Sequence, residues 1–164
     1  EYSSDTSGCL IGVNTANANR VVKDALQKKR IAELSHYPHI YPETTLGNSR
    51  IDFMLQDDGA PKAYVEVKSV TLASQQRALF PDTVTERGRK HCEELATVAQ
   101  QGHAAFLFFC IQRENIREFS VAAHIDTKYA EALEYAKESG VKVLAYGCNM
   151  TKFGIGIADA VEIT

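Results

Sequence analysis

Two short strings, Arg50-Ile51-Asp52-Phe53 and Val65-Glu66-Val67-Lys68, decide the fold predicted for this 164-residue chain. Both alternate apolar and charged residues, which is typical of strands with one buried face. Residues 56–62 between them contain Asp, Gly and Pro, a strong turn signal. A hairpin closed symmetrically on that loop puts Asp52 opposite Glu66, with Cβ atoms roughly 5 Å apart, a like-charge pairing that destabilises a bare sheet. A positive group is therefore expected between the two carboxylates.

A second predicted hairpin adds a third acid. The segments 39–46 and 49–55 are separated by Gly47-Asn48, a two-residue turn signal. Counting back from that turn puts Glu43 opposite Asp52, although a slip of one residue would move the set to the other face. The resulting three-stranded meander carries a row of acids on one face: Glu43, Asp52 and Glu66.

Two interpretations of this acid row stay open. In the first interpretation, the acid row is a solvated face of the sheet. Its acids form diagonal ion pairs with Arg50 and Lys68, which lie opposite each other in the predicted register. In the second, it is a Mg²⁺ or Mn²⁺ site in which Asp52, Glu66 and the carbonyl of Val67 are ligands, since carboxylate oxygens suit these ions. Lys68 would then position or help deprotonate a metal-bound water, while the metal lowers that water's pKa and stabilises charge on an attacked phosphoryl group.

The same residues carry a resemblance to known families. Arg50-Ile51-Asp52-Phe53 followed by Glu66-Val67-Lys68 is similar to the core motif of the PD-(D/E)XK nuclease superfamily, with Ile51 where the motif name has proline. Gly12-Val13-Asn14-Thr15 with Asn19-Arg20, and the blocks 49–53, 64–72 and 78–91, resemble the sugar fermentation stimulation protein A family. That resemblance runs from about residue 12 to about residue 146. It implies a bacterial or archaeal DNA-binding protein linked to sugar (maltose) metabolism, with a restriction-endonuclease-like α/β domain: a mixed central sheet flanked by helices.

Members of that family also carry an N-terminal oligonucleotide-binding-type β-barrel, for which this sequence has no counterpart. We therefore expect residues 1–12 to be a polar lead-in from a missing N-terminal domain. Residues 13–164 are expected to form the nuclease-like domain, a length that suits one compact unit with a sizeable core.

Composition narrows the classes of function. No apolar run approaches the roughly 18 residues of a membrane span and no signal peptide is visible. The cysteines form no CxxC pair and no zinc spacing with histidine, and Cys110 lies in an apolar run as a core thiol, so a reduced, cytoplasmic environment is expected. The net charge of −3 argues against DNA binding by the overall charge of the protein. Local clusters of Lys and Arg would therefore have to bind the phosphates. The four cysteines are Cys9, Cys92, Cys110 and Cys148.

The best such cluster is Arg87, Arg89 and Lys90, with Arg77 upstream. Thr83 and Glu86 form a capping-box pattern, which predicts a helix from about residue 84. Basic residues in a first helical turn oppose the macrodipole, a conflict that a phosphate docked at the helix start would resolve. The alternative is a solvated helix face with Arg87 paired to a nearby acid.

Four further residues border the predicted site. Asn19 lies on a predicted helix that is capped by residue 14 or 15 and ends at about residue 27. In the nuclease fold this helix borders the active site and often carries an acid. Asn19 either replaces that acid or has a surface or capping role. Glu33 follows that helix as another candidate, and Glu43 would be an acid outside the ligand set. For His91 a helix-surface role is preferred over chemistry.

The predicted element order is helix, three-stranded meander, helix, strand, helix, strand. The last three are placed at 104–111, 127–138 and 141–146, and the tail from 149 is left unassigned. The leading hypothesis is a DNA-binding, Mg²⁺- or Mn²⁺-dependent nuclease. The alternatives are a non-catalytic DNA-binding regulator and a structural module whose absent barrel does the binding. DNA versus RNA and homo-oligomer formation stay open.

Overall fold

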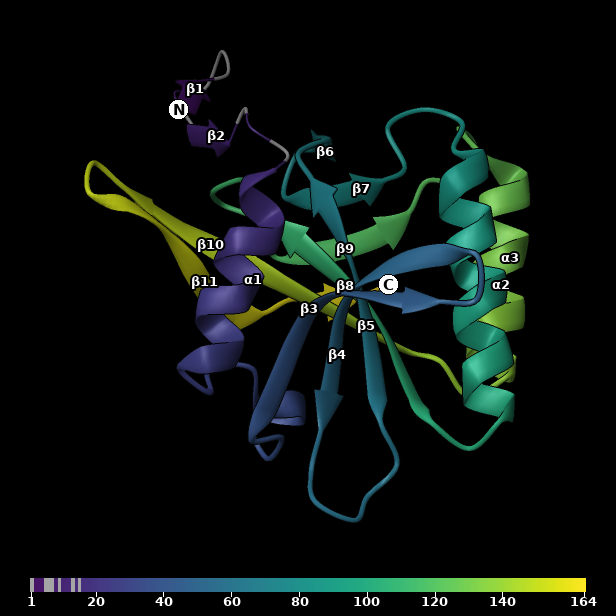
Figure 1. Cartoon of the computed structure of the whole chain (residues 1–164). Coiled ribbons are helices and arrows are strands. Elements are labelled where there is room, and N and C mark those ends of the chain that lie inside the picture. The colour runs from purple at the N-terminus through teal and green to yellow at the C-terminus, as the bar shows by residue number, and fades with distance from the viewer. Residues whose placement is uncertain (1, 5–7, 9, 13, 15) are drawn as a thin grey trace.

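A six-stranded mixed sheet forms the centre of the computed structural model, which describes residues 2–4, 8, 10–12, 14 and 16–164 (Figure 1). Its strand order is β11-β10-β8-β5-β4-β3. The outer pairs are antiparallel, whereas β5, β8 and β10 run parallel. The strands are β3 (His39–Leu46), β4 (Ser49–Gln56), β5 (Ala63–Val70), β8 (Ala104–Ile111), β10 (Lys142–Thr151) and β11 (Gly154–Ala160).

Both predicted hairpin registers are present. In the β3–β4 pair Thr45 lies opposite Arg50, and in the β4–β5 pair Phe53 lies opposite Val65. Gly47, in the turn between β3 and β4, has φ +56°, a left-handed conformation that glycine adopts without steric cost. The two turn signals therefore predicted which residues lie opposite each other, whereas Ile51 packs in a different core cluster from Phe53 and Leu55, so the faces of β4 do not alternate regularly.

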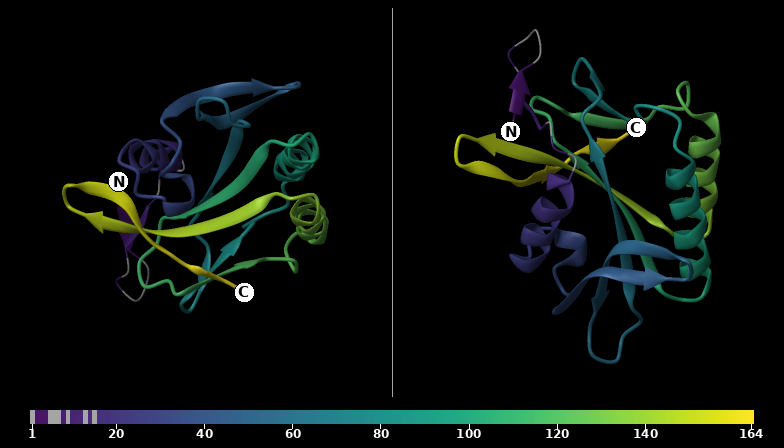
Figure 2. Two further views of the ribbon diagram at one scale, coloured as in Figure 1. Left: turned by 90° about the horizontal axis from the view of Figure 1, so that it is seen from below. Right: turned by 45° about the horizontal axis from the view of Figure 1, so that its top comes forward.

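Helices cover both faces of this sheet, with α1 on one face and α2 and α3 on the other (Figure 2). Alternate residues of β8 enter two separate clusters: Phe108 packs with α1, whereas Leu107 and Phe109 pack with α2 and α3. This confirms the expected α/β class with a mixed central sheet flanked by helices. The helices are α1 (Asn17–Gln27), the short 3-10 helix η1 (Ala32–Leu34), α2 (Glu86–Gln100) and α3 (Thr127–Glu138).

A second, smaller sheet of order β12-β9-β7-β6 was not predicted. Its two longer strands, β7 and β9, pair in parallel although about 40 residues separate them in the sequence, so no local turn signal announces them. The final strand of the chain belongs to it and accounts for the end of the tail. The strands are β6 (Ala73–Ser74), β7 (Arg77–Phe80), β9 (Glu118–Val121) and β12 (Glu162–Ile163).

The predicted lead-in is partly structured. Strands β1 (Tyr2–Ser4) and β2 (Leu10–Gly12) form an antiparallel pair, and the amide of Gly12 donates to the carbonyl of Gln112 at 2.9 Å. Residues 1, 5–7, 9, 13 and 15 lie outside the described part of the chain, so the predictions for Cys9 and for a cap at Thr15 fall there. Helix α1 begins after Ala16, whose side chain makes no cap, and Asn14 instead accepts a hydrogen bond from the Ala16 amide at 3.1 Å.

Helix α2 begins two residues later than the capping pattern predicted. Its cap is Thr85, whose hydroxyl accepts from the Gly88 amide at 3.0 Å. The buried carboxylate of Asp126, which caps α3 at Tyr129, also accepts from the Thr85 amide at 2.9 Å. These backbone hydrogen bonds lower the pKa of Asp126, first of all the one from Thr85. A single carboxylate thus joins the starts of α2 and α3.

This cap can be tested by substitution. Thr85→Ala is expected to lower the free energy of unfolding by about 0.5–2 kcal/mol, because a helix amide loses its acceptor. Thr83→Ala is the matched control and is expected to change it by less than about 0.5 kcal/mol. Urea unfolding followed by circular dichroism measures both, and a larger loss in Thr83→Ala would instead place the cap where the sequence pattern put it.

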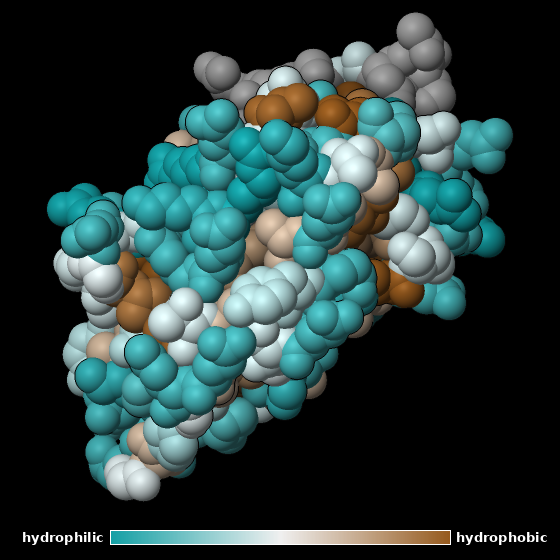
Figure 3. Space-filling view, turned by 90° about the vertical axis from the view of Figure 1, so that its right-hand side faces the viewer, coloured by the Kyte–Doolittle hydropathy of each residue, from teal (hydrophilic) through white to brown (hydrophobic). Residues whose placement is uncertain are grey.

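The surface over α2 and α3 is mostly hydrophilic, with small separated apolar patches (Figure 3). Within the described residues no helix combines the length and the apolar character that crossing a membrane requires. The core contains Cys110 as predicted, and its sulfur lies 3.6 Å from that of Cys148 on the neighbouring strand. Burial raises the pKa of the third described thiol, Cys92, to about 11.

Candidate functional site

The candidate site lies where β4 and β5 separate. Their ladder holds from Leu55–Ala63 to Phe53–Val65 and does not continue to Asp52 and Glu66, the next pair in that register. Instead Oδ2 of Asp52 accepts the amide of Val67 at 2.8 Å. The predicted pairing of Asp52 with Glu66 is thus replaced by a gap between the two strands. The carboxylate of Asp52 accepts the hydrogen bond that a backbone carbonyl would accept in a continuous ladder.

Asp52 and Glu66 are close enough to influence each other's charge. Burial raises the pKa of Asp52, and the negative charge of Glu66 raises it further, against the hydrogen bonds from Val67 and Asn19. Burial also acts to raise the pKa of Glu66, but the hydrogen bond with His91 and the charge of Lys68 hold it below the ordinary value. The site therefore holds two carboxylates with opposite shifts, an arrangement common at functional sites.

Lys68 brings a positive charge to the site, where it pairs with Glu66. Its Nζ lies 2.9 Å from Oε1 of Glu66 and 2.8 Å from Nδ1 of His91, and that imidazole nitrogen is 2.5 Å from the same Oε1. The side chains of Glu66 and His91 are almost fully buried, and that of Lys68 is 12% exposed. Oε2 of Glu66 is buried and has no hydrogen-bond partner in the described part of the structure. An unpartnered, buried carboxylate oxygen is poised to take a ligand.

The surface role predicted for His91 is wrong, because the residue is buried in the site. A signal for this was present in the sequence. His91 precedes Leu95 by four residues and Val98 by seven, which is the spacing of one helix face, and both residues are buried in the core. The imidazole therefore belongs to the stripe of α2 that faces the sheet, where it reaches Glu66 and Lys68.

Of the three remaining candidates, Asn19, Glu43 and Glu33, each lies in a different environment. Asn19 of α1 donates from Nδ2 to Oδ1 of Asp52 at 2.6 Å, so it borders the site as the fold resemblance suggested. Glu43 occupies the position opposite Asp52 between two ladder pairs, but it is exposed and has φ +52°. Glu33 accepts the hydroxyl of Tyr146 at 2.6 Å, which, together with burial, raises the pKa of Tyr146 to about 12.

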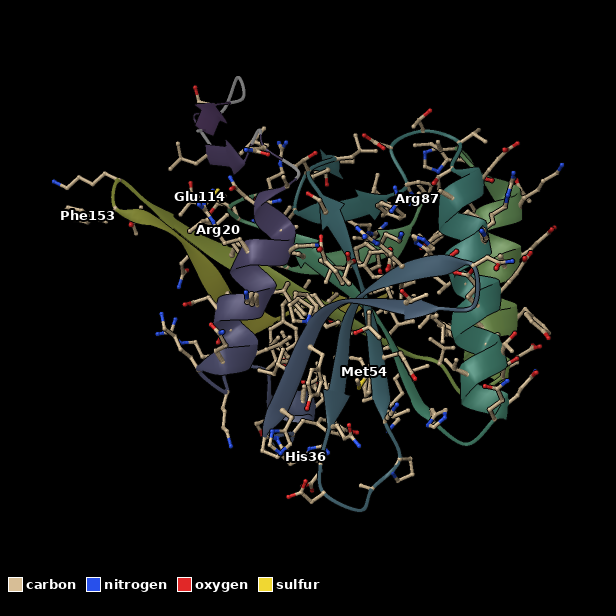
Figure 4. All side chains as sticks on the ribbon, in the orientation of Figure 1. Arg20, His36, Met54, Arg87, Glu114 and Phe153 are labelled. Carbon is tan, nitrogen blue, oxygen red and sulfur yellow. The ribbon has the colours of Figure 1, made fainter. Side chains whose placement is uncertain are left out.

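The residues of the predicted basic cluster differ in whether they have acidic partners. Arg89 lies between Glu86 and Asp126, 3.7 Å from each, and Lys90 lies 3.8 Å from Glu94. Arg87 is exposed near the start of α2, on the opposite side of the sheet from α1 (Figure 4). Of the cluster, Arg87 is thus the side chain best placed to meet a phosphate.

Outside the cluster, two further basic residues differ in their surroundings. Arg50 is exposed on β4, two residues before Asp52. Arg77 is held by Glu118 through hydrogen bonds of 2.8 and 3.0 Å from its guanidinium. Arg50 is therefore the second candidate for contact with a phosphate near the site.

The opposed pKa shifts predict a pH-dependent stability. Because the pKa of Asp52 is raised, the folded state holds its proton more tightly than the unfolded state, and stability is lost as pH rises from 3.8 through the folded pKa. Asp52→Asn removes that penalty, so its free energy of unfolding is expected to exceed the wild-type value at pH 7. The difference should shrink below pH 3.8. Urea unfolding at several pH values measures it, and a variant less stable than wild type at pH 7 would contradict the assignment.

The donor set suits a small divalent cation with few protein ligands. The described residues contain no group of three or more His, Cys, Asp or Glu arranged to hold a metal ion. The carboxylates of Asp52 and Glu66 nevertheless both lie at the gap, and Oε2 of Glu66 is buried with no hydrogen-bond partner among the described residues. Mg²⁺ takes one or two protein carboxylates and completes its shell with water and substrate phosphate.

Comparison with known proteins places this geometry in context. The family model described as "Sugar fermentation stimulation protein RE domain" matches residues 16–154. Among solved structures, the chain is similar to SfsA of Pyrococcus furiosus, which was determined in complex with Ca²⁺. The TM-score is 0.88 at 28% sequence identity, and the match covers 96% of this chain and 68% of the other.

Proposed function

Because the chain belongs to the sugar fermentation stimulation protein family, we propose that it binds DNA and hydrolyses phosphodiester bonds with the help of Mg²⁺ or Mn²⁺. The observation that carries this proposal is the pair of half-buried Asp52 and buried Glu66 at the gap in the sheet, with Lys68 beside Glu66. Glu66 and Lys68 hold the spacing of the nuclease motif on one strand, and Asp52 meets them from the next.

In this proposal Asp52, Glu66 and the carbonyl of Val67 hold the cation. The Ca²⁺ in the similar Pyrococcus structure supports a divalent cation, although Ca²⁺ itself often binds without supporting reaction because it is larger and less demanding in geometry than Mg²⁺. A bound cation would activate water and stabilise the charge that develops on the phosphoryl group.

The side chains around the carboxylates have separate roles. The ammonium of Lys68 orients the attacking water, and Glu66 fixes that ammonium by accepting its hydrogen bond at 2.9 Å. Asn19 fixes the carboxylate of Asp52 from the other side of the sheet. Arg87 and Arg50 are exposed and contact the phosphates flanking the bond that breaks.

A cleavage assay tests the proposal. Supercoiled plasmid and single-stranded DNA are incubated with the chain and Mn²⁺ or Mg²⁺, with a chelator in the parallel reaction. Cleavage that needs the cation and is lost in Asp52→Asn supports the proposal. DNA that stays intact with both cations, under conditions where cation binding is demonstrated, refutes the catalytic part of it.

A second candidate function, DNA binding without chemistry, is favoured by one observation. The ammonium of Lys68 lies 2.9 Å from Oε1 of Glu66, so it already balances the negative charge of that carboxylate without a cation. A regulator of this kind would bind DNA in the presence of chelator with an affinity that falls steeply with salt. That affinity would be unchanged in Glu66→Gln.

A further inference from the structure

The β10–β11 hairpin extends beyond the body of the sheet. Strand β10 pairs with β8 from Lys142 to Gly147, whereas its pairing with β11 continues to Thr151 and Gly154. At about 3.3 Å a residue, the last four residues of β10 extend about 13 Å past that neighbour. Figure 1 shows this two-stranded arm reaching outward beside α1.

An aromatic ring and a cation lie at the tip of the arm. Lys152 and Phe153 are the two residues of the turn, and the hydroxyl of Thr151 accepts the Phe153 amide at 3.2 Å. Phe153 is 89% exposed, and Nζ of Lys152 lies 5.0 Å from the centre of its ring. A single exposed phenylalanine is unremarkable by itself. This one stands at the end of an ordered arm, away from the body (Figure 4).

Residues 17–30, which form α1 and the turn after it, are a strongly basic stretch of the chain. Residues 17–30 contain five basic side chains and one acidic, in a chain whose net charge is −3. The acid, Asp24, is paired with Lys28 at 2.8 Å. Arg20, Lys23 and Arg30 are exposed. This positive charge is therefore local and is concentrated on one helix and the turn that follows it.

This basic stretch connects the candidate site to the arm. At one end Arg20 follows Asn19, which holds Asp52. At the other end a guanidinium nitrogen of Arg30 lies 3.9 Å from where a Cβ on Gly156 of β11 would be. Ile157 of the same strand packs in one core cluster with Val21, Val22 and Ala25 of α1. The helix and the arm are thus one continuous surface that begins at the site.

We propose that this surface binds a DNA strand, with phosphates along Arg20, Lys23 and Arg30 and an unpaired base stacked on Phe153. The inference rests on the proposed function and names where the substrate lies. Phosphate neutralisation by Lys and Arg supplies affinity, and stacking on an exposed ring adds affinity that tolerates any base. Lys152 brings a further charge to the backbone beside the stacked base.

Fluorescence anisotropy with a labelled single-stranded oligonucleotide in chelator tests the surface apart from chemistry. Phe153→Ala is expected to weaken binding by about fivefold to a hundredfold, the usual effect of losing one stacked base. It should leave the salt dependence unchanged. The double variant Arg20→Gln/Lys23→Gln should reduce the slope of log affinity against log salt by about 0.7 for each cation removed.

The controls are matched in residue type and lie on α3. Tyr135→Ala removes another exposed aromatic ring, and Lys128→Gln/Lys137→Gln removes two other exposed cations; neither should change DNA affinity. Photo-crosslinking from 5-iodouracil in the oligonucleotide should label Phe153. Thermal unfolding should be unchanged in Phe153→Ala, because the ring is in water.

The outcomes separate the two proposals. Wild-type binding that Phe153→Ala and Arg20→Gln/Lys23→Gln leave intact overturns the surface and leaves the proposed function standing. Wild-type protein that binds no oligonucleotide, either in chelator or with Mn²⁺, overturns both. Binding to anionic phospholipid vesicles, lost in these variants while DNA affinity is unaffected, also overturns the surface as a DNA site.

Discussion

Glu66→Gln is expected to abolish the binding of Mn²⁺ to this protein. The substitution removes a charged ligand whose second oxygen is buried and has no hydrogen-bond partner among the described residues. The loss in affinity should therefore exceed the roughly 10- to 100-fold that removing an outer contact to a metal ligand costs. Isothermal titration calorimetry of wild type and variant with Mn²⁺ measures it without any assumption about the substrate. Wild-type binding that survives in the variant would contradict the proposed ligand set.

Unfolding must be separated from the loss of a ligand. Glu66 has a lowered pKa, so its charge stabilises the fold above the ordinary pKa of 4.5, and that contribution is lost as pH falls through the folded pKa. Glu66→Gln is therefore expected to destabilise the fold, whereas Asp52→Asn should stabilise it. Both should lose Mn²⁺. Equal losses in variants of opposite stability would exclude unfolding as the cause, and Glu131→Gln on the exposed side of α3 is the matched control.

Lys68→Met should change cation affinity and cleavage in opposite directions. The ammonium lies 2.9 Å from Oε1 of Glu66 and competes with a cation for that carboxylate, so its removal should tighten Mn²⁺ binding. The same ammonium orients the attacking water, so cleavage at saturating Mn²⁺ should fall by about 10²- to 10⁴-fold. Calorimetry and the plasmid assay measure the two effects on one preparation.

Lys128→Met, on the exposed face of α3, serves as the control for charge removal and should leave both quantities at their wild-type values. Two results would count against the proposed role. Weaker Mn²⁺ binding in Lys68→Met would mean that the ammonium organises Glu66 for the cation instead of competing with it. Undiminished cleavage would remove Lys68 from the chemistry.

The central sheet was predictable because its registers are encoded locally. Gly47-Asn48 and the Asp- and Gly-containing loop before β5 fix two hairpins, and the positions of these turns fix which residues lie opposite each other. The unbroken apolar run of β8 marked a strand buried on both faces, and it lies inside the sheet. The motif residues Asp52 and Glu66 could be placed side by side for the same reason.

The parts that sequence reasoning missed depend on distant contacts. The parallel pairing of β7 and β9 has no local turn, and both strands are only four residues long. Thr85 rather than Thr83 caps α2, and its amide is held by Asp126, a residue 41 positions away. The spacing of His91 to Leu95 indicated its place on the buried stripe of α2, but its contacts with Glu66 and Lys68 depend on how α2 packs against β5. The charge of residues 17–30 was overlooked, although Lys28-Lys29-Arg30 are consecutive, because the sequence does not show that they share a surface with Arg20 and Lys23 of α1.

The amide of Val67, at the gap between β4 and β5, should report on the state of the site. In an unbroken ladder this N–H would donate to a carbonyl whose electron density never changes. Here it donates to a carboxylate that can gain a proton or a cation, so its chemical shift in ¹⁵N–¹H spectra should follow the state of Asp52. The backbone thereby contains a native spectroscopic reporter of site occupancy, readable without substrate, label or turnover.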